Sequence, residues 1–169
     1  MSVERLRSGR EVLIRPIRPG DEPELKAAHA RLSARTKYLR FLAPKPHLND
    51  GETRYFVHVD GHDHVALVAT PADQPERILA VARFVRLPED PQTAEFAIVV
   101  GDSVQHEGLG TRLMTVLAEA AAERGIVRFR ATVLAENVAM HRLIGDLPGR
   151  VVREEHQGLV DEIDVELAA

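Results

Sequence analysis

The segment that most constrains the fold joins an apolar strand to the longest amphipathic helix of the chain. Residues 94–100 are nearly all apolar, and residues 109–121 carry apolar side chains at helical spacing. The loop between them holds Gly108 and Gly110, and Gly125 marks the end of the helix. A strand, a glycine-bearing loop and a helix in this order predict a domain in which helices pack on a sheet.

Further strand and helix signals lie on both sides of this unit. They predict one layer of sheet with helices on its faces, of α/β or α+β class, although their order alone fits several folds. The predicted strands are residues 12–17, 64–70, 78–85, 94–100, 129–134, 151–153 and 159–167. The predicted helices begin near Asp21, Ser33, Asn49, Leu109 and Asn137.

Length and composition narrow the class of protein. The chain of 169 residues fits a single domain spanning 1–169. Cysteine is absent, which excludes disulfides, thiolate metal ligands and a cysteine nucleophile. The net charge is −4 and the basic residues form no stripe, so we expect no nucleic-acid partner. The apolar runs are too short to cross a bilayer, so we expect no membrane partner and a cytoplasmic location.

The glycine-bearing loop has the chemistry of an anion site. A helix N-terminus offers unpaired backbone N–H groups and the positive end of the helix dipole, and glycine lets a diphosphate approach closely. Glycines that serve only the geometry of the turn are the alternative. A Walker A loop is excluded because Thr111 and Arg112 follow Gly110 where Lys and Ser or Thr are required. A dinucleotide fingerprint is excluded by the bulky Leu113.

The pattern Gln-x-x-Gly-x-Gly at residues 105–110 resembles the acetyl-CoA pyrophosphate loop of the GNAT superfamily of N-acetyltransferases. Residues 15–21 resemble the opening strand and helix start of that family, residues 94–100 its fourth strand, and residues 137–143 its last helix. The resemblance implies a mixed, mostly antiparallel α/β sheet of about seven strands with about four helices.

A narrower likeness concerns bacterial Pat-type protein lysine acetyltransferase domains. It rests on residues 32–42, on residues 62–69, and on Glu136-Asn137 followed by Met140. The likeness implies transfer of acetyl from acetyl-CoA to a primary amine, with a protein lysine as the expected acceptor and no metal. A small-molecule amine acceptor and a non-catalytic acyl-CoA sensor are the alternatives. A homodimer is compatible with the sequence.

The family resemblance also assigns roles to individual residues. Backbone groups of Ile98, Val99 and Val100 would pair with the pantetheine arm and polarise the thioester carbonyl. Asn137 would bind the pantetheine, and Met140 would pack near the thiol. The pyrophosphate would be held by the loop residues Gln105, His106, Glu107, Gly108, Leu109, Gly110 and Thr111.

Glu95 is the candidate general base. An amine must lose a proton before it attacks a thioester, and a carboxylate can remove that proton directly or through water. A carboxylate among apolar neighbours has a raised pKa, which suits a base, although a purely structural role is the alternative. The tyrosine that serves many family members as general acid is missing, because the only tyrosines are Tyr38 and Tyr55. A thiolate leaves without such help. Because no cysteine is available to form an acyl-cysteine intermediate, direct attack on bound acetyl-CoA is the expected reaction.

Other motifs receive a structural interpretation. We expect His58, His62 and His64 to make capping or substrate-side polar contacts rather than to bind a metal. Ser103 is expected to be a loop residue rather than a nucleophile. Residues 38–42 are expected to pack in the core, with a role in lining the acceptor cleft as the alternative. His141 and His156 have no partner that the sequence reveals.

Overall fold

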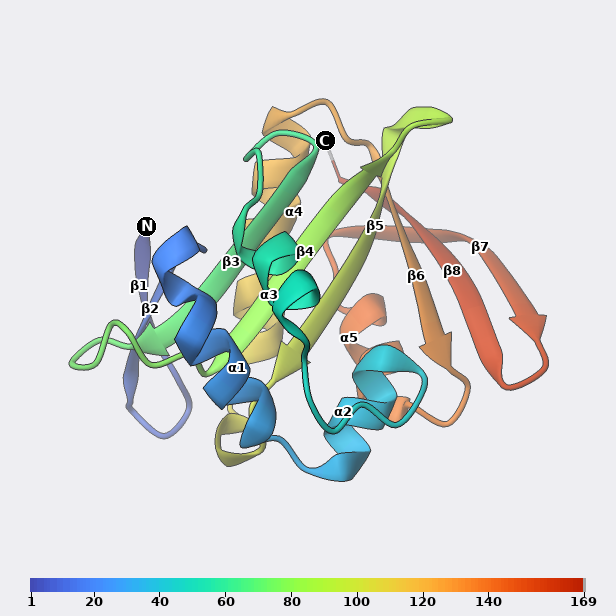
Figure 1. Cartoon of the computed structure of the whole chain (residues 1–169). Helices are drawn as coiled ribbons and strands as arrows, with labels where there is room; N and C mark the ends of the chain where they lie inside the picture. The colour runs from blue at the N-terminus through green and yellow to red at the C-terminus, as the bar shows by residue number, and fades with distance from the viewer. Residues whose placement is uncertain (169) are drawn as a thin grey trace.

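A computed structural model describes residues 1–168 as an eight-stranded sheet with helices on both faces (Figure 1). The strand order is β1-β2-β3-β4-β5-β6-β8-β7, and every neighbouring pair is antiparallel except β5 and β6. The strands are β1 (Ser2–Arg5), β2 (Glu11–Pro16), β3 (His64–Pro71), β4 (Ala80–Leu87), β5 (Asp90–Val100), β6 (Arg128–Leu134), β7 (Gly149–Gln157) and β8 (Val160–Leu167). The helices are α1 (Glu22–Ala30), α2 (Ala34–Phe41), α3 (Asp50–Val57), α4 (Leu109–Glu123) and α5 (Val138–Gly145).

The expected mixed, mostly antiparallel α/β sheet is confirmed, with one strand more than predicted. The extra strand is β1, which pairs with β2 at the edge of the sheet. Its four residues are mostly polar and only alternately half-buried, so no apolar pattern marked them as a strand. The strand predicted at residues 94–100 begins earlier, at Asp90, and forms a hairpin with β4.

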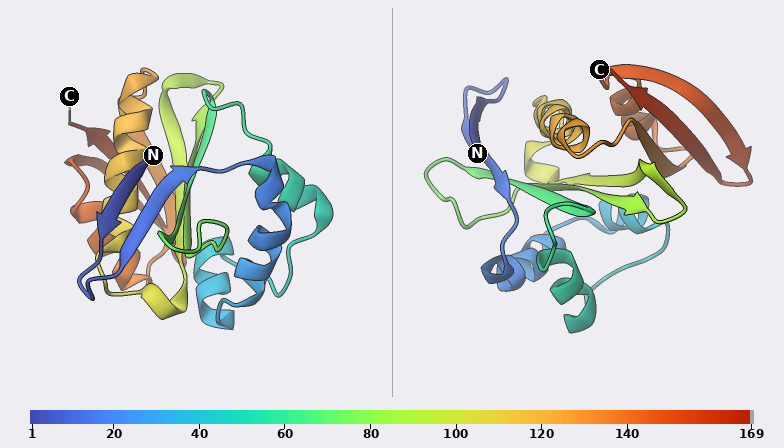
Figure 2. Two further views of the ribbon diagram at one scale, coloured as in Figure 1. Left: turned by 90° about the vertical axis from the view of Figure 1, so that its left-hand side faces the viewer. Right: turned by 90° about the horizontal axis from the view of Figure 1, so that it is seen from above.

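Two hydrophobic cores lie on opposite faces of the sheet. The helices that cover the two faces are seen in Figure 2. The larger core packs α4 and α5 against one face and contains the fully buried Leu113 and Leu117 of α4. The smaller core packs α1 and α3 against the other face around Leu25, Val57 and Val68. None of the helices in residues 1–168 is long and apolar enough to cross a membrane.

The starts of α2 and α3 follow side-chain capping chemistry, whereas the start of α1 does not. The Ser33 side chain accepts a hydrogen bond from the Thr36 N–H, and Asn49 forms a capping box with Glu52. Asp21, near which the helix was predicted to begin, occupies the N-cap position of α1, but its buried carboxylate makes no capping bond to that helix. It accepts two hydrogen bonds from Arg15, at 2.8 and 2.9 Å, and so ties the helix start to β2.

The feature that creates the candidate site is the separation of β5 and β6. These two parallel strands pair only from Thr93 to Glu95 on β5, and the last pair is Glu95 with Arg130. Beyond Glu95, β5 keeps its pairs with β4 but has none with β6, and the two strands diverge with α5 below the gap (Figure 1). The backbone edge of β5 beyond Glu95 is therefore free of partners in β6, which leaves hydrogen-bonding groups available to a ligand.

Candidate active site

A cleft of about 360 Å³ occupies the gap between β5 and β6 and extends to the start of α4. We call it the β5–β6 cleft. It brings together eleven of the thirteen site residues predicted from the sequence, although these lie in three separate segments of the chain. The eleven are Ile98, Val99, Val100, Gln105, His106, Gly108, Leu109, Gly110, Thr111, Asn137 and Met140.

The loop before α4 has the backbone that an anion site needs. Gly108 occupies the N-cap position with φ of 84°, and His106 also has a positive φ of 65°. This conformation is natural for glycine, and it places the unpaired N–H groups of the first helical turn at the cleft. Gly110 also faces the cleft, and a Cβ there would lie 3.7 Å from Val100 and 3.8 Å from Leu143. Side chains larger than alanine at this position would therefore narrow the cleft.

Neighbouring segments anchor this loop from two sides. The Arg7 N–H donates to the Glu107 carbonyl at 3.2 Å, and the Arg7 guanidinium donates to the His106 carbonyl at 3.4 Å. The Gln105 side chain donates to the Val100 carbonyl at 3.1 Å, so it fixes the end of β5. Gln105 thus both lines the cleft and donates a hydrogen bond to the protein backbone.

Asp102 links the same loop to α2. Its carboxylate accepts hydrogen bonds from the Ser33 N–H at 2.7 Å and from the Thr36 hydroxyl at 2.6 Å. Partial burial alone would raise the pKa of Asp102, but these hydrogen bonds outweigh it and lower the pKa. Asp102 is therefore ionised at neutral pH and holds the first turn of α2 beside the cleft, where Thr36 forms part of the lining.

Glu95 and Glu107 are the two predicted site residues that do not line the cleft. Glu95 is exposed, so the apolar surroundings expected for its side chain are absent, although it sits where the strands separate. Glu107 is half-buried, and its position away from the cleft suits a diphosphate site because a carboxylate would repel the phosphates. Among residues 1–168, neither Tyr38 nor Tyr55 lines the cleft.

Arg7 and Arg142 of the cleft were not predicted from the sequence, whereas Leu39 and Arg40 belong to residues 38–42, for which cleft lining was the alternative. Arg7 comes from the turn between β1 and β2, Leu39 and Arg40 come from α2, and Arg142 comes from α5. No residue of α2 is fully buried, but Phe41 packs against the smaller core as expected, whereas Leu39 and Arg40 take the alternative role and line the cleft. The arginines carry no motif in the sequence, and only the folding of distant segments brings them to one cleft.

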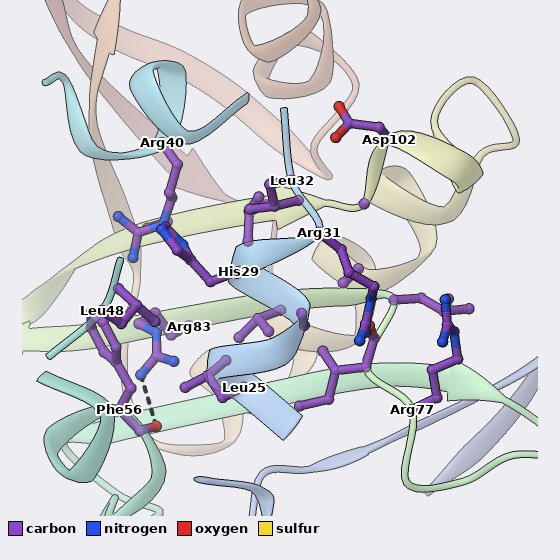
Figure 3. A pocket seen from close by; sticks show the side chains of 18 of the residues that line it. Leu25, His29, Arg31, Leu32, Arg40, Leu48, Phe56, Arg77, Arg83 and Asp102 are labelled. Carbon is purple, nitrogen blue, oxygen red and sulfur yellow. Dashed lines mark hydrogen bonds between the residues drawn. The ribbon is translucent and has the colours of Figure 1, made fainter. Parts of the chain in front are cut away.

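A second cavity of about 340 Å³ lies on the other side of β5, beside α1 (Figure 3). We call it the α1 cavity. Apolar side chains form much of its wall, including Leu25, Phe41, Leu48, Phe56 and Val81. Three residues line both this cavity and the β5–β6 cleft, namely Arg40, Ala97 and Val99. The two spaces therefore adjoin one another across β5.

The histidines near β3 do not converge on one point. His62 contacts Asp63, whereas His64 is buried and accepts a hydrogen bond from Arg83, with a pKa lowered to about 4 chiefly by burial. The contacts of His58 and His62 agree with the polar role expected for them.

His141 and His156 do have a partner, which the sequence did not reveal. Both imidazoles contact the Asp161 carboxylate, and the distance from His141 Nε2 to Asp161 Oδ2 is 2.8 Å. Glu154 lies within 4.8 Å of the His141 and Asp161 ligand atoms, so these three side chains could hold a cation.

Comparisons with known proteins agree with this geometry. The family model described as "Acetyltransferase (GNAT) family" matches residues 31–145. The chain is 34% identical over 160 residues to Acetyltransferase Pat of Mycolicibacterium smegmatis, covering 95% of this chain and 47% of that protein. It thus spans about half the length of this relative. It is also 31% identical over 142 residues to Acetyltransferase PA5475 of Pseudomonas aeruginosa, covering 83% of this chain and 76% of that one.

Solved structures share the fold over nearly the whole chain. The GNAT domain of S. lividans PAT aligns with a TM-score of 0.89 and 31% identity, covering 98% of this chain and 96% of that one. The putative acetyltransferase yncA of Salmonella typhimurium, solved with its cofactor acetyl-CoA, aligns with a TM-score of 0.67 at 18% identity, covering 92% of each chain. The second likeness concerns the fold alone.

Proposed function

Since this chain belongs to the acetyltransferase (GNAT) family, we propose that it moves the acetyl group of acetyl-CoA to a primary amine. One observation carries the proposal: the glycine-bearing start of α4 and the unpaired edge of β5 open into the same cleft. The first offers N–H groups to a diphosphate, and the second offers a strand edge to the amide-containing pantetheine arm. In an acyl-CoA the diphosphate is joined directly to the pantetheine arm, so one molecule can meet both features.

In the proposed complex, each part of the cleft meets one part of acetyl-CoA. The N–H groups from Gly108 to Thr111 hold the pyrophosphate, and the backbone of residues 98–100 pairs with the pantetheine and polarises the thioester carbonyl. The Asn137 side-chain oxygen already accepts the Met140 N–H at 3.1 Å, which leaves the amide N–H of Asn137 to donate to the pantetheine. Met140 then packs near the sulfur.

The proposed reaction is direct attack. The free amine forms a bond to the acetyl carbon, the carbon–sulfur bond breaks, and coenzyme A leaves as a thiolate that takes up a proton. Glu95 stays our candidate base, and its exposure at the point where β5 and β6 separate suits removal of the amine proton through a water molecule.

For the acceptor we propose a protein lysine, supported by the 34% identity to Acetyltransferase Pat. A small-molecule amine is the second candidate, supported by the apolar walls and modest volume of the α1 cavity beside the cleft. We also propose that the chain works as a single domain in the cytoplasm and can form a homodimer. If it bound acetyl-CoA without turning over any amine, it would instead be an acyl-CoA sensor.

Calorimetric titration with acetyl-CoA tests the premise that all of these proposals share, namely that the β5–β6 cleft binds acetyl-CoA. We expect Gly108→Val to weaken binding by about tenfold or more, because it strains a positive φ and crowds the diphosphate site. Gly158→Val is the matched control, since Gly158 also has a positive φ but lies in the β7–β8 turn with open space around it. Equal affinity of both variants would contradict the proposed cofactor site.

A further inference from the structure

The α1 cavity carries positive charge that the protein does not neutralise. Arg83 on β4 is 6% exposed and donates hydrogen bonds to the Phe56 carbonyl at 3.1 Å and to His64 Nε2 at 2.9 Å. Both partners are uncharged, because a histidine nitrogen that accepts a hydrogen bond belongs to a neutral ring. Within residues 1–168, no carboxylate forms an ion pair with Arg83.

Arg40 on α2 is a second cation at the same end of the cavity (Figure 3). Its guanidinium lies 4.6 Å from the centre of the Phe41 ring, and within residues 1–168 it makes no hydrogen bond or ion pair. Burial lowers the pKa of Arg40 to about 10. Burial, followed by repulsion from Arg40, lowers the pKa of Arg83 to about 9. Two partly desolvated guanidinium groups therefore repel one another without an anion nearby.

The other charged residues of the lining do not balance these two. Asp102 is the only carboxylate among the residues that line the cavity, and it lies away from Arg83 and accepts hydrogen bonds from Ser33 and Thr36 (Figure 3). Arg31 and Arg77 lie at the opposite end of the cavity, where Arg31 is paired with Glu24. A buried charge without a partner is costly, so an anionic group bound between Arg40 and Arg83 would be strongly favoured.

We propose that the α1 cavity binds the carboxylate of the acceptor amine, with Arg40 as the contacting residue and Arg83 beside it. The proposal rests on the acetyl-transfer function above and develops its second candidate acceptor, the small-molecule amine, as an amine with an apolar body and a carboxylate, such as an apolar α-amino acid. The apolar walls receive the body, and the volume of about 340 Å³ fits one molecule of that size.

The position of Arg40 explains why amine and carboxylate should be close together in this acceptor. Arg40, Ala97 and Val99 line both the α1 cavity and the β5–β6 cleft, so a carboxylate at Arg40 lies beside the path of the thioester. An amine one carbon away can then reach the acetyl group. A neighbouring guanidinium also lowers the pKa of the ammonium group, which favours the free amine that attacks.

Binding of 4-methylpentanoate, compared with neutral 4-methylpentanamide, tests the carboxylate site without any need for turnover. Calorimetry with the full chain should show the acid binding about tenfold or more tightly than the amide. Arg40→Gln should abolish this difference, whereas Arg77→Gln should keep it, because Arg77 lies at the other end of the cavity. Thermal melting confirms that both variants are folded. Equal binding of acid and amide to the wild type, or no binding of either, would overturn the proposal.

Turnover measurements distinguish a failure of this inference from a failure of the proposed function. Release of coenzyme A from acetyl-CoA is followed with leucine, with leucinamide and with a lysine peptide that has uncharged flanks. Faster turnover of leucine than of leucinamide, lost in Arg40→Gln, supports the proposal. Turnover of the lysine peptide alone rejects the carboxylate site and leaves acetyl transfer intact. Binding of 4-methylpentanoate by a chain that does not bind acetyl-CoA would reject the proposed function and keep the carboxylate site.

Discussion

At the scale of single residues, the buried pair of Arg15 and Asp21 shows how one contact fixes an element. Their side chains are 3% and 6% exposed, and the Arg18 N–H also donates to Asp21 at 2.7 Å. Burial alone would raise the pKa of Asp21, but the hydrogen bonds from Arg15 and Arg18 outweigh it, so the pKa lies below its usual value. The carboxylate thus joins β2 to the start of α1 in its charged form.

We predict that Asp21→Asn lowers the free energy of unfolding by about 3–5 kcal/mol, because it leaves the Arg15 charge buried without a counter-charge. Since the pKa of Asp21 is depressed in the folded state, its contribution is present above the unfolded pKa of about 3.9 and is lost as pH falls through the folded pKa. Urea unfolding between about pH 2 and pH 7 measures both effects. Asp73→Asn, in an exposed loop, is the control; a similar loss there would contradict the prediction.

At the scale of elements, the β7–β8 hairpin is joined to α5 by polar contacts. Most of β7 is exposed, and Asp161 at the start of β8 contacts both His141 of α5 and His156 of β7. His141 Nδ1 lies 2.8 Å from the Asn137 carbonyl, so both of its ring nitrogens face acceptors. This arrangement favours the imidazolium, and the pKa of His141 is raised, first by the Asn137 carbonyl and then, against burial, by Asp161.

We predict that this attachment weakens as pH rises. A raised folded pKa gives a stabilisation that is complete below the unfolded pKa of about 6.5 and is lost as pH rises through the folded pKa. Urea unfolding of the wild type should therefore show a loss of stability above neutral pH that His141→Gln does not show. A titration of His141 by NMR that gave an ordinary pKa would refute the explanation. His47→Gln serves as the control, because His47 is exposed.

At the scale of the whole molecule, the site exists because the parallel strands β5 and β6 are packed together on one core over a short stretch and separate beyond it. Phe129 of β6 is fully buried, and its ring centre lies 5.9 Å from that of Phe84 on β4 and 5.2 Å from that of Phe96 on β5. Phe129 pairs with Ala94, one position before the last β5–β6 pair. The aromatic cluster therefore closes the sheet at the apex of the β5–β6 cleft.

We predict that Phe129→Ala costs about 3–5 kcal/mol of stability, because it leaves a cavity under three strands. Since the three strands share this cluster, their amides should lose protection together in hydrogen exchange. Val3→Ala, at a position 61% exposed, should change stability by less than about 0.5 kcal/mol. Loss of protection limited to β6 would show that the strands are not coupled through Phe129.

The sequence alone was sufficient to predict features that depend on residues adjacent in the chain. Ser33 and Asn49 predicted helix starts correctly, and Gly125, with φ of 79°, ends α4 as expected. Family membership also followed from a short motif, because the loop that begins α4 carries its requirements in adjacent residues such as Gly108 and Gly110. Backbone conformation and capping depend on neighbours in the chain, so the order of residues alone determines them.

Contacts between distant segments were decided only by the tertiary structure. The role of Arg40 on both sides of β5, the link from Asp161 to two histidines and the exposure of Glu95 all depend on which strands pair and where β5 and β6 part. The sequence does not distinguish a charged side chain that is exposed to water from one that forms an ion pair or lines a cavity. The surroundings of its side chain are made by residues far away in the chain, and the packing of the whole sheet determines how close those residues come to it.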